Sequence, residues 1–326
     1  MQIELIKNKL DTVRSQVSLH ESGKGYQVSN PEIDQEFQIM TRVTTILNRG
    51  IPKRELENWK LRQEAEYFST HFRRQLRKNI SSEDKYFSDN IGRRLQKDMA
   101  FEDLVNMIKQ VRTESKTASN MSLAGMTDMA KEVREKSKTA SQRIRDTAAD
   151  WGSRIHHLID RLSYDSSVFV PEKFSHAVDS WYTWISGNNL SIIATEQPLY
   201  FYDEETHVRY CGTADLIAMT QDERILIADY KSGASIYPTY SLQNSAYSMA
   251  LKQILSDLDI STQPKCMVVK LPKTTDEKFL VRESFNVEWQ EEVFFAMAEN
   301  QLLVKSWESD RKKWVPLKKE KVTSDV

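Results

Sequence analysis

The sequence predicts an α/β protein in which a small mixed β-sheet is flanked by helices and preceded by a mostly helical N-terminal region. Three observations lead to this prediction. The first 145 or so residues are polar and poor in glycine, short β-rich runs follow after residue 190, and segments with helical spacing separate those runs. We therefore expect residues 1–144 to form the helical region and residues 145–326 to form the sheet-containing core with a C-terminal helix.

Composition narrows the class of protein. The chain has 326 residues, 39% of them hydrophobic and 29% charged, and its net charge is -1. It has no apolar run of about 18 residues and no signal-peptide core near its start. We therefore expect a cytoplasmic protein with no membrane partner, in which any polyanion is held by local basic patches.

The expected helical region contains a stretch without clear helical spacing, followed by one with it. The stretch "TRVTTILNRG" (41–50) reads as a β-branched run that breaks at Gly50–Pro52, and helical spacing follows from Lys53. The pentapeptide SKTAS occurs at Ser115–Ser119 and again at Ser137–Ser141, in a segment that we interpret as weakly packed helix or a mobile connector.

Two basic clusters lie in the same region. They are Arg73, Arg74, Arg77 and Lys78, and then Arg93, Arg94 and Lys97. Such clusters are typical of contacts with a nucleic-acid backbone, but they also occur on helix faces that only meet water. Both interpretations stay open.

The second half of the chain has alternating helical and β-rich segments. Apolar residues recur at three- and four-residue steps from Ile144 to Leu162, and another helix is expected around 171–187. The runs "SIIATEQPLYF", "RYCGTADLIAM" and "RILIADYKS" predict strands. A helix at 240–255, a strand "KCMVVKL" and a helix at about 287–307 complete the expected core.

The predicted hairpin at 211–233 contains three charged residues, Asp215, Asp229 and Lys231, in apolar surroundings. A short turn near Gln221 places Asp215 opposite Ala228 or Asp229. Facing β-carbons lie about 4.5–5.5 Å apart, so the two carboxylates can share a cation. A purely structural alternative is that Asp215 caps a bulge and Asp229 pairs with Lys231.

Two carboxylates with room for water suit Mg²⁺ or Mn²⁺, and the backbone carbonyl of Tyr230 could add a third oxygen ligand. An ammonium group beside metal-bound water can orient the nucleophile and offset charge that develops on a phosphate. With Lys231 in that role, Asp215, Asp229 and Lys231 predict a site for phosphodiester hydrolysis.

The same residues resemble a known family. Asp215 followed by Asp229-Tyr230-Lys231 is similar to the PD-(D/E)xK nuclease superfamily, and especially to its RecB/Cas4-like branch. Four further segments extend the resemblance, namely "GSRIHHLID" (Gly152, His156), "TEQPLY" (Glu196), "LQNSAYSMA" (Gln243, Tyr247) and the upstream "VTTILNRGIPKRELENWK". The last of these resembles phage exonucleases and the mitochondrial genome-maintenance exonuclease group.

The resemblance implies a restriction-endonuclease-like core and assigns roles to residues. His156 would bind the metal with Asp215, Asp229 and the Tyr230 carbonyl, with His157 as the second choice. Glu196 would bind metal or water or pair with Lys231, unless it is an ordinary edge-strand acid. Gln243 and Tyr247 would border the site, although Tyr247 could equally be core packing, and Ser232 could contact a phosphate.

We therefore expect a Mg²⁺- or Mn²⁺-dependent DNA exonuclease of phage-type or repair-type recombination. Its helical N-terminal region would shape a channel for DNA that is single-stranded or has free ends. A recombination or single-strand-binding protein is a possible partner. Cys211 and Cys266 are too few for the iron–sulfur cluster of many relatives. The alternatives are an endonuclease with the same site and a non-catalytic DNA-binding protein.

Overall fold

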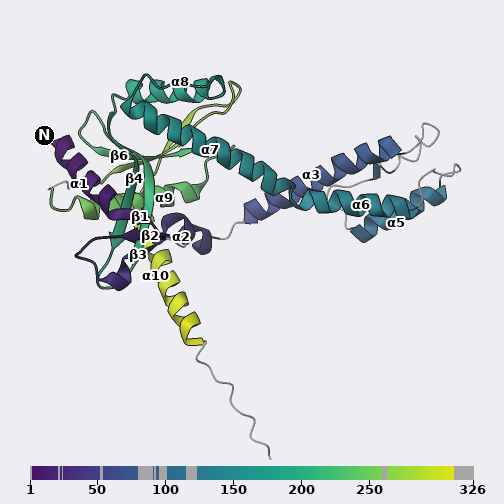
Figure 1. Ribbon diagram of the computed structural model, residues 1–326, viewed down its shortest axis with the longest axis horizontal. Helices are drawn as coiled ribbons and strands as arrows, with labels where there is room; N and C mark the ends of the chain where they lie inside the picture. The colour runs from purple at the N-terminus through teal and green to yellow at the C-terminus, as the bar shows by residue number, and fades with distance from the viewer. Residues whose placement is uncertain are drawn as a thin grey trace, which may run out of the picture. The chain divides into compact units, whose positions relative to one another are not determined.

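The computed structural model of the chain (Figure 1) describes residues 2–20, 23, 25–51, 54–79, 91, 93–94, 101–114, 123–258 and 263–311. These residues fall into two compact units. Unit 1 comprises residues 1–52 and 152–326, and unit 2 comprises residues 53–151.

Unit 1 contains the sheet and most of the helices. Before residue 53 its elements are α1 (Gln2–Gln16), β1 (Val17–Leu19), β2 (Gly25–Val28), η1 (Gln35–Phe37), β3 (Ile39–Arg42) and α2 (Val43–Gly50). After residue 151 they are the second half of α7 (Ala140–Tyr164), α8 (Glu172–Gly187), β4 (Ser191–Tyr202), β5 (Arg209–Met219), β6 (Ile225–Lys231), α9 (Pro238–Ile254), β7 (Lys265–Lys270), β8 (Leu280–Glu283) and α10 (Val287–Arg311).

In the described part of the chain, eight strands form one mixed sheet in the order β1-β2-β3-β5-β6-β7-β8, with β4 also paired to β5. The long β4 lies antiparallel along one edge of β5, from Ser191↔Met219 to Tyr202↔Arg209. The other edge of β5 is shared, because β3 pairs parallel to Tyr210 and Cys211 and β6 pairs antiparallel to residues 216–219. Residues 212–215, including Asp215, lie between these two ladders.

Helices cover both faces of the sheet. One core cluster joins the strands to α1, α2, α9 and α10 through residues that include Leu10, Ile46, Ile227, Leu251 and Phe294. On the other face, the buried Trp181 of α8 donates an indole hydrogen bond to the hydroxyl of Tyr230. Ile227 and Tyr230 are an odd number of residues apart on β6, so their side chains point to opposite faces.

Unit 2 is helical in the residues that the structure describes. It contains α3 (Arg54–Asn79), α5 (Phe101–Glu114), α6 (Leu123–Lys138) and the first half of α7. Its core is a cluster of apolar side chains, among them Phe72, Leu104, Ile108, Met126 and Val133. None of the described helices is long and apolar enough to cross a membrane.

The structure confirms the α/β class and a mixed sheet flanked by helices, and it adds or changes three details. The sheet is larger than expected, because residues 17–42 supply β1, β2 and β3. Within the β-branched run, the stretch 43–50 is the helix α2, whose Val43, Ile46 and Leu47 are buried at helical spacing. The division of the chain also differs from the expected 144/145 boundary, because α1 packs on β4 and carries residues 1–52 into unit 1.

Candidate metal centre

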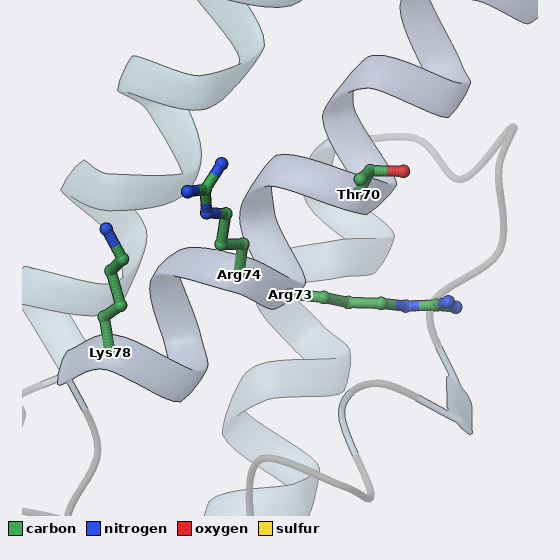
Figure 2. Close-up of a pocket in the computed structure, with 4 residues that line it drawn as sticks. All are labelled: Thr70, Arg73, Arg74 and Lys78. Atoms are coloured by element: carbon green, nitrogen blue, oxygen red, sulfur yellow. The ribbon is translucent and has the colours of Figure 1, made fainter.

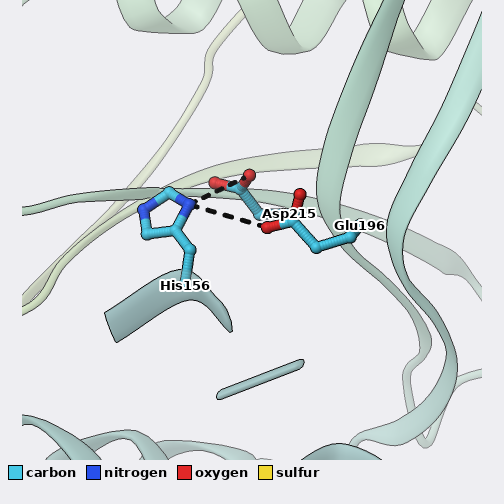
Figure 3. A group of neighbouring side chains, drawn as sticks. All are labelled: His156, Glu196 and Asp215. Atoms are coloured by element: carbon cyan, nitrogen blue, oxygen red, sulfur yellow. Dashed lines mark ion pairs between the residues drawn. The ribbon is translucent and has the colours of Figure 1, made fainter. Parts of the chain in front are cut away.

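A histidine and two carboxylates from three different elements meet at one point of unit 1 (Figure 3). His156 comes from α7, Glu196 from β4 and Asp215 from β5. His156 Nδ1 lies 3.4 Å from Asp215 Oδ1 and 3.7 Å from Glu196 Oε1. One potential ligand atom from each residue lies within 4.8 Å of the others, which is a spacing that a single cation can bridge.

Glu196 reaches this cluster through an unusual backbone conformation. Its φ is +44°, inside a strand where the neighbouring residues are extended. The left-handed conformation costs a residue with a side chain about 1–2 kcal/mol, and such strain often marks functional sites. It also interrupts the alternation of side chains. Consequently Thr195 contacts Asp160 and Glu196 contacts His156, although Asp160 and His156 lie on the same helix.

The side chain of Asp215 is bonded to the backbone of β6, at a place where the ladder between β5 and β6 has ended. The backbone N–H of Tyr230 donates to Asp215 Oδ2 at 2.6 Å, so one carboxylate oxygen takes over the role of a ladder carbonyl. The other oxygen, Oδ1, faces His156. Tyr230 thus contacts the site through its N–H, and the expected role of its carbonyl as a metal ligand stays a prediction.

The buried Asp229 and the partly exposed Lys231 form an ion pair, with 2.5 Å between Asp229 Oδ2 and Lys231 Nζ. The ammonium group also donates to Gln243 Oε1 at 3.3 Å. Gln243 in turn donates through Nε2 to the hydroxyl of Tyr247 at 2.9 Å. The ring of Tyr240 lies under the ammonium group, 4.8 Å from Nζ to the centroid. Helix α9 therefore fixes the direction of Lys231.

The charges of these groups shift one another's pKa values. Burial works to lower the pKa of His156, but the nearby Asp215 carboxylate, with help from Glu196 and Asp229, raises it to about 10. Burial raises the pKa of Asp229 to about 6, against the opposing effect of Lys231. Burial also disfavours ionised Asp215, yet the positive charge of His156 holds the pKa of that carboxyl below its usual value.

The donor set fits a divalent cation. Imidazole nitrogen together with carboxylate oxygen suits Mn²⁺ and related metals, and carboxylate oxygens with water suit Mg²⁺. Asp229 Oδ2 is buried and has an ion pair but no well-formed hydrogen bond. The residues that could hold a metal are His156, Glu196 and Asp215, with Asp229 beside them. The sequence had placed Asp229 among the ligands and left the role of Glu196 open.

The other residues that the sequence singled out lie around the cluster or outside it. His157 is exposed on α7, outside the described cluster. A β-carbon at Gly152 would lie 3.1 Å from Ser232 Oγ and not within 4 Å of the imidazole of His156, so this glycine leaves room for Ser232 and not for His156. Ser232 therefore lies over α7, next to the cluster. Tyr247 is 3% exposed and so belongs to the core. Its hydroxyl also accepts a hydrogen bond from Gln243, which bonds Lys231.

The basic residues of the N-terminal region belong to unit 2. Thr70, Arg73, Arg74 and Lys78 line a surface pocket of about 450 Å³ on α3 (Figure 2). Figure 2 shows Arg74 and Lys78, one helical turn apart, both extending upward in this view, while Arg73 extends to the right. Arg93 and Arg94 are exposed and helical. Lys97, the side chain of Arg77 and the first SKTAS copy lie outside the described residues.

Sequence reasoning missed several contributors to the site. They are Trp181, Tyr240, Asp160, Thr195 and Arg14. Tyr240 could have been found, because it lies one turn before Gln243 on the predicted helix. Thr195 precedes Glu196 on β4. Trp181, Asp160 and Arg14 come near the site only through the tertiary fold, Arg14 by bonding Thr195 and Gln197, and no local pattern identifies them.

Both cysteines are free and buried, Cys211 in β5 and Cys266 in β7. Burial raises the pKa of each thiol, which keeps both in the neutral form. Neither lies in the cluster of His156, Glu196 and Asp215.

Comparisons with known proteins identify no family for this chain. No family model and no curated protein matches the chain. One solved structure that aligns with it is the crystal structure of SSO0001. That alignment has 14% sequence identity, covers 73% of this chain and 97% of the other, and has a TM-score of 0.28. A similarity at this level carries no argument about fold or function.

Proposed function

We propose that the chain is a metal-dependent DNA exonuclease that hydrolyses phosphodiester bonds in DNA recombination or repair. One observation carries the proposal. The cluster of His156, Glu196 and Asp215 is joined to the Asp229–Lys231 ion pair by the N–H of Tyr230, in the order of motifs that resembles the RecB/Cas4-like nucleases. The mixed sheet with helices on both faces is compatible with the restriction-endonuclease-like core that the resemblance implies.

The ligand residues and the lysine would have separate tasks. A bound Mg²⁺ or Mn²⁺ would supply a Lewis acid and an activated water at this position. His156, Glu196 and Asp215 would hold it, and His156 would have to release its proton to do so. Tyr230 fixes Asp215 through its N–H, so that one carboxylate oxygen is already oriented.

Lys231 would act on the substrate. Its ammonium group can orient the attacking water and offset the negative charge that develops on the phosphate. Asp229, Gln243 and Tyr240 fix the direction of this group. The pKa of Lys231 is raised, because Asp229 and Asp215 outweigh its burial, so it stays charged at neutral pH.

Unit 2 supplies the proposed contacts with the DNA backbone. Arg74 and Lys78 extend together from α3, and Arg93 and Arg94 are exposed. Backbone contacts of this kind are insensitive to sequence and decrease with salt. We further propose that the protein acts in the cytoplasm, that of the host if its gene is of phage origin, and that a recombination or single-strand-binding protein assists it there.

The test compares two forms of one DNA. A covalently closed single-stranded circle and its linear form are incubated with the protein and Mn²⁺, and with EDTA as the control. Loss of the linear form alone supports the exonuclease. Rapid cutting of the circle would show an endonuclease with the same site. Metal-independent DNA binding without cleavage of either form would support the non-catalytic alternative.

A further inference from the structure

We propose that Arg14 of α1 is a positioning residue for the metal centre, because it holds β4 on both sides of Glu196. Its Nη2 donates to the carbonyl oxygen of Thr195 at 2.8 Å and to Gln197 Oε1 at 3.0 Å. Thr195 and Gln197 are the two neighbours of Glu196. This inference rests on the proposed function, in which Glu196 is a ligand.

The contacts of Arg14 matter because of the backbone between them. Glu196 is the residue with φ +44°, and without restraint its backbone would favour the extended conformation of the rest of β4. In an extended strand the side chain of Glu196 would point to the face opposite that of Thr195. The carboxylate would then leave His156. Holding residues 195 and 197 fixes the strained residue between them.

Gln197 is itself immobilised. It is 0% exposed, and its Nε2 donates to the carbonyl oxygens of Leu10 at 3.0 Å and of Pro198 at 2.9 Å. Leu10 lies one turn before Arg14 on α1 and is 1% exposed. Gln197 therefore bonds α1 through both ends of its amide, by donating to Leu10 and accepting from Arg14. An amide held in this way makes a fixed point directly after Glu196.

Thr195 is held from a second helix. Its hydroxyl donates to Asp160 Oδ1 at 2.5 Å and lies 3.3 Å from the hydroxyl of Tyr164. Asp160 is four residues after His156 on α7, so the two side chains share one face of that helix. Thr195 thus contacts α1 through its carbonyl and α7 through its hydroxyl. Arg14 completes a connection that fixes the distance between Glu196 and His156.

Arg14 makes no contact with His156, Glu196 or Asp215 among the described interactions, so its effect must pass through Thr195 and Gln197. Removing a group that orients a metal ligand typically lowers metal affinity about tenfold or more. We therefore expect Arg14→Met to weaken Mn²⁺ binding about tenfold, measured by titration calorimetry. Arg14→Lys should lie between, because one ammonium can keep one of the two contacts.

A matched control lies on the same helix. Lys9 is also a cation of α1, but its ion pair, at 2.5 Å, is with Asp257, which does not belong to β4. Lys9→Met should leave Mn²⁺ affinity unchanged. Equal weakening by Lys9→Met and Arg14→Met would mean that any change of α1 affects the site, and it would overturn the assignment.

A double-mutant cycle tests the route of the effect. In a Glu196→Gln background the ligand is already impaired, so adding Arg14→Met should cause little further loss of Mn²⁺ affinity. Losses that simply multiply would show that Arg14 does not act through Glu196. Thermal unfolding of each variant identifies any that is not folded.

A metal-free measurement separates this inference from the proposed function. Amide hydrogen exchange in a peptide that covers residues 191–202 should be at least tenfold faster in Arg14→Met than in the parent protein, without any metal. Unchanged exchange would overturn the inference even if the parent protein binds Mn²⁺ and cleaves DNA. Faster exchange in a protein that never binds Mn²⁺ would instead reject the proposed function and leave the role of Arg14 in holding β4.

Discussion

Lys231 pairs with Asp229, two residues earlier on β6, so both charges of the strand point to the same side of the sheet. The carboxylate is the buried member of the pair, because Asp229 is only 1% exposed whereas the side chain of Lys231 is 21% exposed. A buried carboxylate that loses its cation becomes much harder to ionise. Each member of the pair therefore sets the charge of the other.

Removing Lys231 should abolish cleavage and also change the titration of Asp229. Lys231 lowers the pKa of Asp229, which burial has raised to about 6. In Lys231→Met that pKa should rise further, so that more of Asp229 is protonated at pH 7. Infrared or NMR titration of the carboxyl group measures the shift. Lys265→Met is the control, because Lys265 of β7 pairs with Asp222, in the turn between β5 and β6. An unshifted titration would contradict the buried pairing.

Metal binding should release a proton from His156. The pKa of His156 is raised to about 10, so the ring is protonated at neutral pH and must lose that proton to coordinate. Apparent Mn²⁺ affinity should therefore increase as pH rises from about 6 to 8. Calorimetry in buffers of different ionisation enthalpy should detect close to one proton released per metal.

The neighbouring histidine provides the control. His157 lies on the same helix and is exposed. His156→Asn should lose the proton release and most of the affinity for Mn²⁺, whereas His157→Asn should keep both. Equal effects of the two substitutions would remove His156 from the ligand set.

Gly212→Ala should both destabilise the protein and impair the site. A β-carbon there would lie 2.6 Å from Cε1 of Tyr247 and 3.1 Å from Cγ2 of Val43, and Tyr247 bonds Gln243. Overpacking of this kind costs about 1–3 kcal/mol in the free energy of unfolding. Denaturant unfolding measures it. Gly187→Ala, which meets nothing within 4 Å, is the control and should cost far less.

Charge reversal of Arg74 and Lys78 should weaken binding to all DNA sequences alike. Each lost phosphate contact should reduce the slope of log affinity against log salt by about 0.7 for single strands. Fluorescence anisotropy over a range of salt concentrations measures this. Lys60→Glu, on the same helix but paired with Glu64, is the control. An unchanged slope would return these residues to a solvated helix face.

The sequence predicted the hairpin well, because buried acids in an apolar β-rich run have few purely structural explanations. The family resemblance favoured His156 over His157, and His156 is the one that lies beside Glu196 and Asp215. The contribution of α1 could not be predicted, since Arg14 and Thr195 are 181 residues apart and no local pattern connects them. The positive φ of Glu196 was not predicted either. The polar run Thr195-Glu196-Gln197 interrupts a β-rich stretch, but such a run does not by itself indicate a left-handed residue.

The stretch 43–50 shows that a short segment need not adopt the structure that its local propensity favours. Its β-branched residues favour a strand, and only packing against α9 and α10 decides for a helix. The division between the two units was missed for a related reason. Residues 17–42 form short strands whose partners are each other and β5, so their place in the sheet depends on distant residues.

The central claim is that His156, Glu196 and Asp215 hold the cation that cleaves DNA. The most direct test measures Mn²⁺ binding and cleavage of end-labelled linear DNA for the parent protein and for Asp215→Asn, which keeps the shape of the side chain. Asp222→Asn, at the exposed turn of the same hairpin, is the control. We predict that Asp215→Asn, although folded, loses both activities, while Asp222→Asn keeps both. A folded Asp215→Asn protein that binds Mn²⁺ and cleaves as the parent does would contradict the account.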